Sequence, residues 1–396
     1  MSATLSPFRT HWREIIRVFL KLGAMSPGGP GLIGILQLEL QQKRAWLSKE
    51  RFVEGLALVN MLPGPTATQL GIFLGYARAG WWGGLLAGFC IILPAFVIML
   101  TLTLLYTHYG AVPRLRGVFS GLNPVVIGVF AVALYQLSTA AITDVARGML
   151  ALASALLLGF TPVGIVPILL LAGALGVALY GSRPWGLVAT TLGASLHGVL
   201  IWGGSGLQLP ALPWLASGPW TGLHTPGLWH IGLFFAKVGI FTFGGGLILL
   251  AFLQEQVVSH LRWLTPQEFL DGLAIGRLTP GPLPMLAAFI GYKLSGLWGS
   301  MVAAVSIFVP PCALLLGILP LLERIQHVAW LKAALKGIGP AIVGMTAVAL
   351  LRMLPTAVPG VVPAALALGT VVVMLAWRVS PLPLLAVGGV IGLLSA

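Results

Sequence analysis

WLSKERFVEGLALVNMLPGP, residues 46–65, returns later in the chain as WLTPQEFLDGLAIGRLTPGP, residues 263–282, with nine of the twenty positions identical. Both stretches end in Pro-Gly-Pro. This combination interrupts a helix because proline lacks a backbone N–H, whereas glycine adopts backbone angles that other residues avoid. A match of this length does not arise from low-complexity runs of Leu, Ala and Gly, so the chain contains an internal repeat.

The repeat extends to both sides at a spacing of 216 or 217 residues. Upstream, FLKLGAMSPGGPG (19–31) matches FAKVGIFTFGGGL (235–247), which aligns two Gly-Gly pairs. Further matches lie downstream: GYARAGWWG (75–83) with GYKLSGLWG (291–299), and GLNPVVIGVFAVAL (121–134) with GIGPAIVGMTAVAL (337–350). We therefore expect three parts: an N-terminal repeat at 1–182, a linker with one unmatched transmembrane helix at 183–227, and a C-terminal repeat at 228–396.

The composition is that of a membrane protein. Of the 396 residues 58% are apolar and only 8% are charged, whereas soluble domains carry about 25% charged residues. The mean hydropathy is +1.00. The formal charge of +13 comes from Lys and Arg scattered at the ends of apolar segments, as the positive-inside bias requires. We therefore predict an all-α polytopic protein in a lipid bilayer, with no nucleic-acid partner and a homodimer as one option for its assembly.

The number of crossings predicts an inverted relation between the halves. If the two broken segments of each half are re-entrant hairpins, each half crosses the bilayer four times. The unmatched apolar stretch at 185–204 then turns the second half upside down. We expect the loops around residues 45 and 325 in the cytoplasm and those around 110 and 262 in the periplasm.

Each repeat contains two breaks, one at Gly-Gly and one at Pro-Gly-Pro. Broken segments at corresponding positions of two halves indicate a transporter's binding site, because freed backbone groups are tolerated only in protein or beside a polar cavity. The helix that restarts after a break presents N–H groups and a positive dipole end to an anion. The backbone and hydroxyl candidates are Ser26, Gly28, Gly29, Gly64, Thr242, Gly244, Gly245 and Gly281. Close helix packing by small residues is the alternative for the glycines.

Ionisable and amide side chains near the breaks complete the predicted site. Lys21 and Lys237 share one repeat position, and snorkelling to the headgroups is the alternative explanation for each. Arg277 lies three residues before a break, where the other half has Asn60. An arginine offers fixed, paired donors to an oxyanion; alternatively it is the partner of a carboxylate inside the protein.

Four of the nine carboxylates occupy repeat positions, Glu39 with Glu255 and Glu54 with Asp271. Acidic residues in symmetric places could carry protons or pair with the cations near the breaks. We expect no catalytic residue, no metal site and no cofactor. Cys90 and Cys312 lie in apolar runs and are expected to be packing residues.

These blocks resemble the chromate ion transporter (ChrA) family in its long, two-domain form. The resemblance rests on the Lys-x-Gly-x-x-Ser-x-Gly-Gly-Pro run with its downstream Trp-Leu and Leu-Pro-Gly-Pro, repeated with Gly-Gly-Gly and Pro-Gly-Pro, over nearly the whole chain. It implies efflux of chromate across the bacterial inner membrane, and hence chromate resistance.

Other functions stay open on the residues alone. Sulfate has the shape and charge of chromate, so a transporter of sulfate or another tetrahedral oxyanion is the nearest alternative. A passive anion channel and a membrane-embedded enzyme are further ones, although the chain has no HExxH and few carboxylates for a metal. No Walker motif is present, so uphill transport would depend on an ion gradient or exchange.

Overall fold

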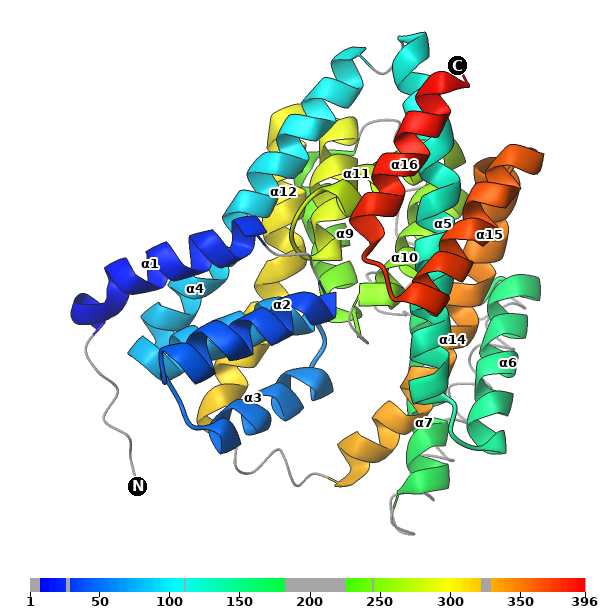
Figure 1. Ribbon diagram of the computed structural model, residues 1–396. Coiled ribbons are helices and arrows are strands. Elements are labelled where there is room, and N and C mark those ends of the chain that lie inside the picture. Colours follow the sequence, from blue (N-terminus) through cyan, green and yellow to red (C-terminus); the bar gives the residue numbers. More distant parts are fainter. Residues whose placement is uncertain are drawn as a thin grey trace.

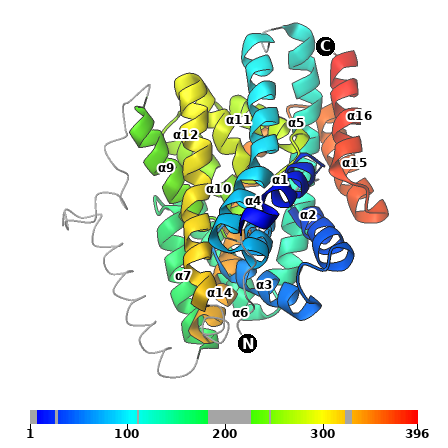
Figure 2. The same cartoon turned by 90° about the vertical axis from the view of Figure 1, so that its left-hand side faces the viewer.

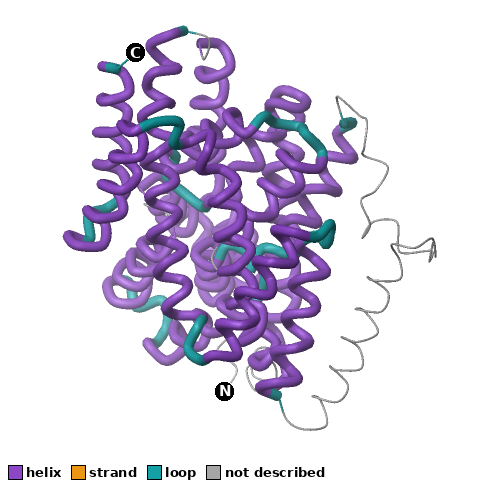
Figure 3. Tube along the Cα trace, turned by 90° about the vertical axis from the view of Figure 1, so that its right-hand side faces the viewer, coloured by secondary structure: helices purple, strands orange, loops and turns teal. Residues whose placement is uncertain are grey.

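The N-terminal half is a run of helices interrupted where the sequence predicts. The computed structural model describes residues 8–25, 29–109, 112–181, 226–243, 246–321 and 329–395. The elements of this half are α1 (Phe8–Met25), α2 (Gly29–Leu36), η1 (Gln37–Lys43), α3 (Lys49–Met61), α4 (Thr66–Tyr109), α5 (Pro113–Ala141), α6 (Val145–Phe160) and α7 (Ile165–Tyr180). The described residues contain helices and loops and no strand, as Figure 3 shows. The predicted all-α fold is confirmed.

The C-terminal half repeats this order. Its elements are α9 (Leu228–Ile240), α10 (Leu247–Leu253), η4 (Gln254–His260), α11 (Pro266–Leu278), η5 (Leu283–Met285), α12 (Leu286–Ile318), η6 (Leu319–Leu321), α14 (Ala329–Ala357), α15 (Val361–Trp377) and α16 (Pro381–Leu394). The predicted boundaries of the three parts stay a prediction. The unmatched stretch at 185–204 lies outside the described residues.

The two halves share unusual backbone angles as well as element order. In α4 the helix is broken at Ala79 and Gly80, and α12 is broken at Ser295 and Gly296 with nearly the same dihedrals. Helices α3 and α11 are both capped by a hydroxyl, from Ser48 and Thr265 respectively. A hydroxyl that accepts a backbone N–H satisfies one of the unpaired donors at a helix start. The repeat therefore encodes the local chain path.

The halves exchange their last two helices. Helix α5 packs against α15 and α16 of the other half, and α14 packs against α6 and α7. Figure 1 shows α5 beside α16 and α14 beside α6 and α7 on its right-hand side. Glycines permit the close approach: a Cβ on Gly121 would overlap Gly388, and one on Gly176 would overlap Gly337. For these glycines, packing between helices explains the residue type.

Among the described residues, four helices are long and apolar enough to cross a membrane by length and composition: Thr66–Tyr109, Leu115–Ala141, Leu283–Ile318 and Ala329–Ala357. Large apolar side chains on the outer surface support this, with Phe89 61% and Val361 86% exposed. Figures 1 and 2 place α3 near the lower end of the molecule and its counterpart α11 towards the opposite end. This placement agrees with an inverted repeat, which stays a prediction.

Candidate functional site

The Pro-Gly-Pro turns join α3 to α4 and α11 to η5. Gly64 has φ of 127° and Gly281 has φ of 125°, angles that favour glycine because a Cβ would be strained there. A Cβ on Gly281 would also lie 2.5 Å from the Cβ of Ala95 in α4. A Cβ on Gly64 would lie 2.6 Å from Nε2 of Gln69 and 2.7 Å from the Cβ of Pro311. Both turns therefore need glycine for conformation and for space.

Breaks from the two halves meet inside the protein. The N–H of Gly64 donates to the carbonyl oxygen of Thr242 at 2.5 Å, which joins the first Pro-Gly-Pro turn to the second Gly-Gly break. Gln69 in α4 donates from its side-chain amide to the carbonyl oxygens of Pro63 at 2.6 Å and Pro311 at 3.5 Å. The buried hydroxyl of Thr242 donates to the carbonyl oxygen of Val238 at 2.7 Å. Its hydrogen is thus already engaged.

Several residues that we predicted in the Gly-Gly breaks are not among those that the structure describes. Ser26, Gly28, Gly244 and Gly245 lie outside the described residues, and Gly29 is the first residue of α2. Their part in an anion site stays a prediction.

Arg277 lies in the last turn of α11, directly before the second Pro-Gly-Pro turn. Its guanidinium carbon is 4.2 Å from the centroid of the Phe130 ring in α5, a cation–π contact. Its Nε is buried without a hydrogen-bond partner. Within the described part of the chain, no hydrogen bond or ion pair joins this side chain to another residue. The carboxylate partner that we considered for Arg277 is therefore absent from those residues, because Asp271 is bound elsewhere.

The other predicted polar residues are spread out. Lys21 on α1 and Asn60 on α3 are exposed, so the structure does not gather them with Arg277. Lys237 on α9 is half-buried, and its ammonium has no acidic partner within the described ranges. Asn60 and Arg277 therefore occupy the same repeat position in sequence but have different surroundings in the structure.

Three of the four repeat carboxylates form ion pairs with cations that the sequence did not indicate. Glu39 pairs with Lys43 at 3.2 Å and Arg44 at 3.4 Å, and Glu54 pairs with Arg51 at 3.0 Å. Glu255 is buried and pairs with Arg352 of α14, whose guanidinium also donates to the carbonyl oxygen of Leu158 in α6. The last contact ties the two halves together.

Asp271, 5% exposed, is held differently from these three. Its Oδ1 accepts hydrogen bonds from the Asn123 amide at 2.8 Å and the Gln267 amide at 2.9 Å, and its Oδ2 accepts one from the Tyr106 hydroxyl at 2.8 Å. All three partners are uncharged. Sequence reasoning found Asp271 but missed these partners. The only available signal was that Asn123 is polar within an apolar run.

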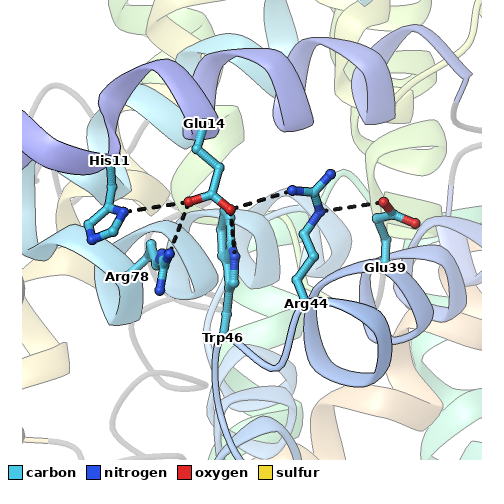
Figure 4. A network of polar contacts seen from close by, with 6 residues as sticks. All are labelled: His11, Glu14, Glu39, Arg44, Trp46 and Arg78. Carbon is cyan, nitrogen blue, oxygen red and sulfur yellow. Dashed lines mark hydrogen bonds and ion pairs between the residues drawn. The ribbon is translucent and has the colours of Figure 1, made fainter.

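A second polar network, also missed, joins α1, η1 and α4 (Figure 4). The carboxylate of Glu14 accepts hydrogen bonds from Arg78 at 3.0 Å, Trp46 at 3.2 Å and Arg44 at 3.4 Å. Partial burial raises the pKa of Glu14, but the hydrogen bond and charge of Arg78, with smaller contributions from Trp46 and Arg44, hold it below its ordinary value. The residue types of this network do not recur in the second half, where His230 and Leu294 occupy the positions of Glu14 and Arg78.

The described residues do not meet the requirements of a metal site or of a disulfide bond. Among the described residues, no group of three or more His, Cys, Asp or Glu side chains could hold a metal ion. Cys90 and Cys312 are both unpaired. The carboxylates of Asp271 and Glu255 are buried between helices, and buried ionisable groups of this kind are functional candidates in membrane proteins.

Comparison with known proteins identifies the family. A sequence model described as "Chromate transporter" matches residues 13–179 and again 229–393. The chain belongs to the chromate transporter family. The chromate transport protein of Cupriavidus metallidurans is 31% identical over 385 residues, covering 97% of this chain and 93% of that protein. The probable chromate transport protein of Synechococcus elongatus is 34% identical over 76% of this chain, and the chromate transport protein of Pseudomonas aeruginosa is 30% identical over 84%. No solved structure matches the chain.

Membership of the chromate transporter family agrees with the helical architecture. The two matched segments contain every candidate residue named above, including Arg277 and Asp271. The stretch between them contains the unmatched segment 185–204. The family and the apolar helices together describe a multi-pass membrane protein with a chromate transport role, whose substrate is an oxyanion.

Proposed function

We propose that this protein is a secondary transporter that exports chromate from the bacterial cytoplasm across the inner membrane and so confers chromate resistance. The relatives that are named as chromate transport proteins support the substrate. The observation on which the mechanism rests is Arg277, a cation without an acidic partner among the described residues, next to a helix break.

A partly buried cation without a carboxylate partner, such as Arg277, is unfavourable unless another anion neutralises it for part of the cycle. The only described contact of the Arg277 side chain with a neighbouring group that favours its charge is the Phe130 ring. A tetrahedral dianion would supply the missing acceptors, because the guanidinium donates two parallel hydrogen bonds to adjacent oxygens. Backbone N–H groups beside the breaks would hold the remaining oxygens.

The inverted topology would give such a site access to both sides of the membrane in turn. The contact between Gly64 of one half and Thr242 of the other supports this idea, since it joins the Pro-Gly-Pro break of one half to the Gly-Gly break of the other. Movement of one half against the other would disturb this junction first. Alternating access in repeat transporters takes this form.

Sulfate is the second candidate substrate, because it presents the same four oxygens and the same charge. Backbone donors and one arginine do not separate the two ions by shape. A passive channel and an enzyme remain weaker alternatives, since the relatives are named as transporters.

The experiment is radiolabelled chromate flux in membrane vesicles of known orientation, with unlabelled sulfate as competitor. Saturable chromate accumulation in inside-out vesicles is expected, because the cytoplasmic face is then outside. Accumulation only in right-side-out vesicles would reverse the direction. Flux that never saturates and follows the membrane potential would indicate a channel. Labelled sulfate transported in preference to chromate would make sulfate the substrate.

A further inference from the structure

A polar cavity of about 430 Å³ lies between α4, α5, α11 and α12, with Asp271 in its wall. Its lining residues are Tyr106, Thr107, Arg116, Phe119, Gln267, Asp271 and Lys293. Arg116 is exposed whereas Asp271 is buried. The cavity therefore leads from the surface towards a carboxyl group within the helices and gives water a route to it.

The partners of Asp271 suit either protonation state of its carboxyl group. A tyrosine hydroxyl and a side-chain amide can each donate to a carboxylate, and each can accept from the protonated acid after a rotation. Arginine and lysine can only donate, so they favour the ionised form alone. The other inward carboxylates of the described region have such cations: Arg352 beside Glu255, and Lys293 beside Glu268 at 2.7 Å.

Asn123 provides a second, independent observation. Its Oδ1 is buried without a hydrogen-bond partner, while its amide nitrogen donates to Asp271. Rotating the amide by half a turn would bring this unpaired acceptor to the carboxyl group, where a protonated Asp271 could donate to it. This acceptor has no partner while Asp271 is ionised, and it can accept a hydrogen bond once Asp271 is protonated. A carboxyl group that binds and releases a proton requires such an acceptor.

The charges around Asp271 leave its protonation free to vary. Lys293 is already neutralised by Glu268, and Arg116 is exposed. Helix α16, which packs on α5 and α11, has no ionisable side chain. Helix α14, which also packs on α11, carries Lys332 and Lys336, both exposed, and Arg352, which is paired with Glu255. Along α11, Arg277 follows six residues later, about 9 Å along the axis at the ordinary rise of a helix.

We propose that Asp271 takes up one proton when an oxyanion binds at Arg277, so that the protein binds the dianion and a proton together. The proposal rests on the proposed function. An ionised Asp271 repels a dianion at Arg277 through a medium of low dielectric constant. The carboxylate takes up one H⁺ from the bulk solvent, which reaches it through the cavity, and becomes a neutral acid, which removes the repulsion. The coupling is reciprocal, so anion binding favours protonation to the same extent.

The described residues contain one such site rather than two. The repeat counterpart of Asp271 is Glu54, which pairs with Arg51. Gly339 stands where Asn123 stands in the other half, and Glu50 stands where Gln267 does. We therefore expect one proton per oxyanion.

The test is equilibrium binding by the purified full-length protein in detergent, with labelled sulfate and chromate, from about pH 5 to pH 9, where carboxyl groups with raised affinity for protons titrate. Sulfate stays a dianion over this range, whereas chromate itself takes up a proton near neutral pH. For the wild type we expect affinity to fall by up to about tenfold per pH unit above the titration of Asp271. A weakly buffered solution should show uptake of one proton per sulfate bound.

Three variants separate the roles. Asp271→Asn mimics the neutral acid and should bind sulfate with an affinity independent of pH and without proton uptake. Asp271→Glu keeps a titratable group and should keep proton uptake. Tyr106→Phe removes one donor from the ionised form, so the fall in affinity should move to higher pH. Glu50→Gln, an exposed carboxyl on α3, is the control and should behave as wild type.

The outcomes distinguish this proposal from the proposed function. A wild type that binds neither anion contradicts the proposed function and this inference with it. A wild type that binds sulfate with the same affinity at every pH contradicts this inference alone, as does undiminished proton uptake by Asp271→Asn. If only chromate binds, the proton uptake of wild type is compared with that of Asp271→Asn. Smaller uptake by the variant supports this inference, and equal uptake contradicts it. If Asp271→Asn does not fold, an unchanged pH profile in Tyr106→Phe overturns the inference.

Discussion

Replacement of Arg277 tests the proposed anion contact most directly. A hydrogen bond to a charged group contributes roughly 1.5–3 kcal/mol, so Arg277→Gln should weaken chromate binding by about ten- to hundredfold. Arg277→Lys keeps the charge but loses the planar pair of donors, and its loss should be below about tenfold. The order of the variants, wild type above Lys above Gln, is the prediction.

Protein stability should change little in the same variants. The cation–π contact with Phe130 is worth about 0.5–2 kcal/mol. The loss of this contact is offset because the variant no longer holds a partly buried cation that has no described acidic partner. Abundance in the membrane should therefore stay near that of wild type, and the defect should appear in flux.

The assay is initial chromate flux in inside-out vesicles at several concentrations, normalised to protein abundance. Lys49→Gln, which removes an exposed cation from α3, serves as the control for net charge and should leave the apparent affinity unchanged. A wild-type apparent affinity in Arg277→Gln would refute the anion contact. Loss of the Arg277→Gln protein, restored by adding Asp271→Asn, would show instead that these two residues form the ion pair that the described geometry lacks.

Three further predictions concern the turns, the topology and the Glu14 network. In thermal unfolding of the purified protein, Gly281→Ala should be destabilising by about 1–3 kcal/mol through backbone strain and overlap with a neighbouring Cβ. The control is Gly159→Ala, at an exposed helical position with no atom within 4 Å. It should be neutral or stabilising by up to about 1 kcal/mol. In a background without other cysteines, an impermeant thiol reagent added to cells should label Arg262→Cys and not Ala45→Cys. Labelling of both positions would exclude the inverted topology, and the reverse pattern would turn the predicted orientation in the membrane around. The pKa of Glu14 is lowered in the folded state, so the contribution of this carboxylate to stability is fully present above the pKa of the unfolded state and is lost as pH falls. The difference in melting temperature between wild type and Glu14→Gln should therefore shrink on acidification. A difference that does not vary with pH would contradict this.

The local structure of this protein follows from short stretches of its sequence. Pro63, Gly64 and Pro65 can be predicted from sequence to end one helix and start another, because missing N–H groups and the freedom of glycine act within a few bonds. The same holds at the second turn, so the repeat predicts matching breaks. Apolar runs of the length of α5 and α14 likewise predict membrane helices from composition alone.

The environments of the candidate residues depend on the packing of helices far apart in the chain. Nothing near Asp271 in sequence indicates that Asn123, 148 positions away, donates to it, or that Glu255 pairs with Arg352 of another helix. The repeat itself suggested equal roles for Glu54 and Asp271, yet one is paired with an arginine and the other is buried among neutral donors. Sequence determined where the chain breaks and which residues are ionisable. Tertiary structure decided which of those residues have a charged partner, because the exchange of α15 and α16 between the halves and the contact of α4 and α5 with α11 bring together side chains that no local rule relates.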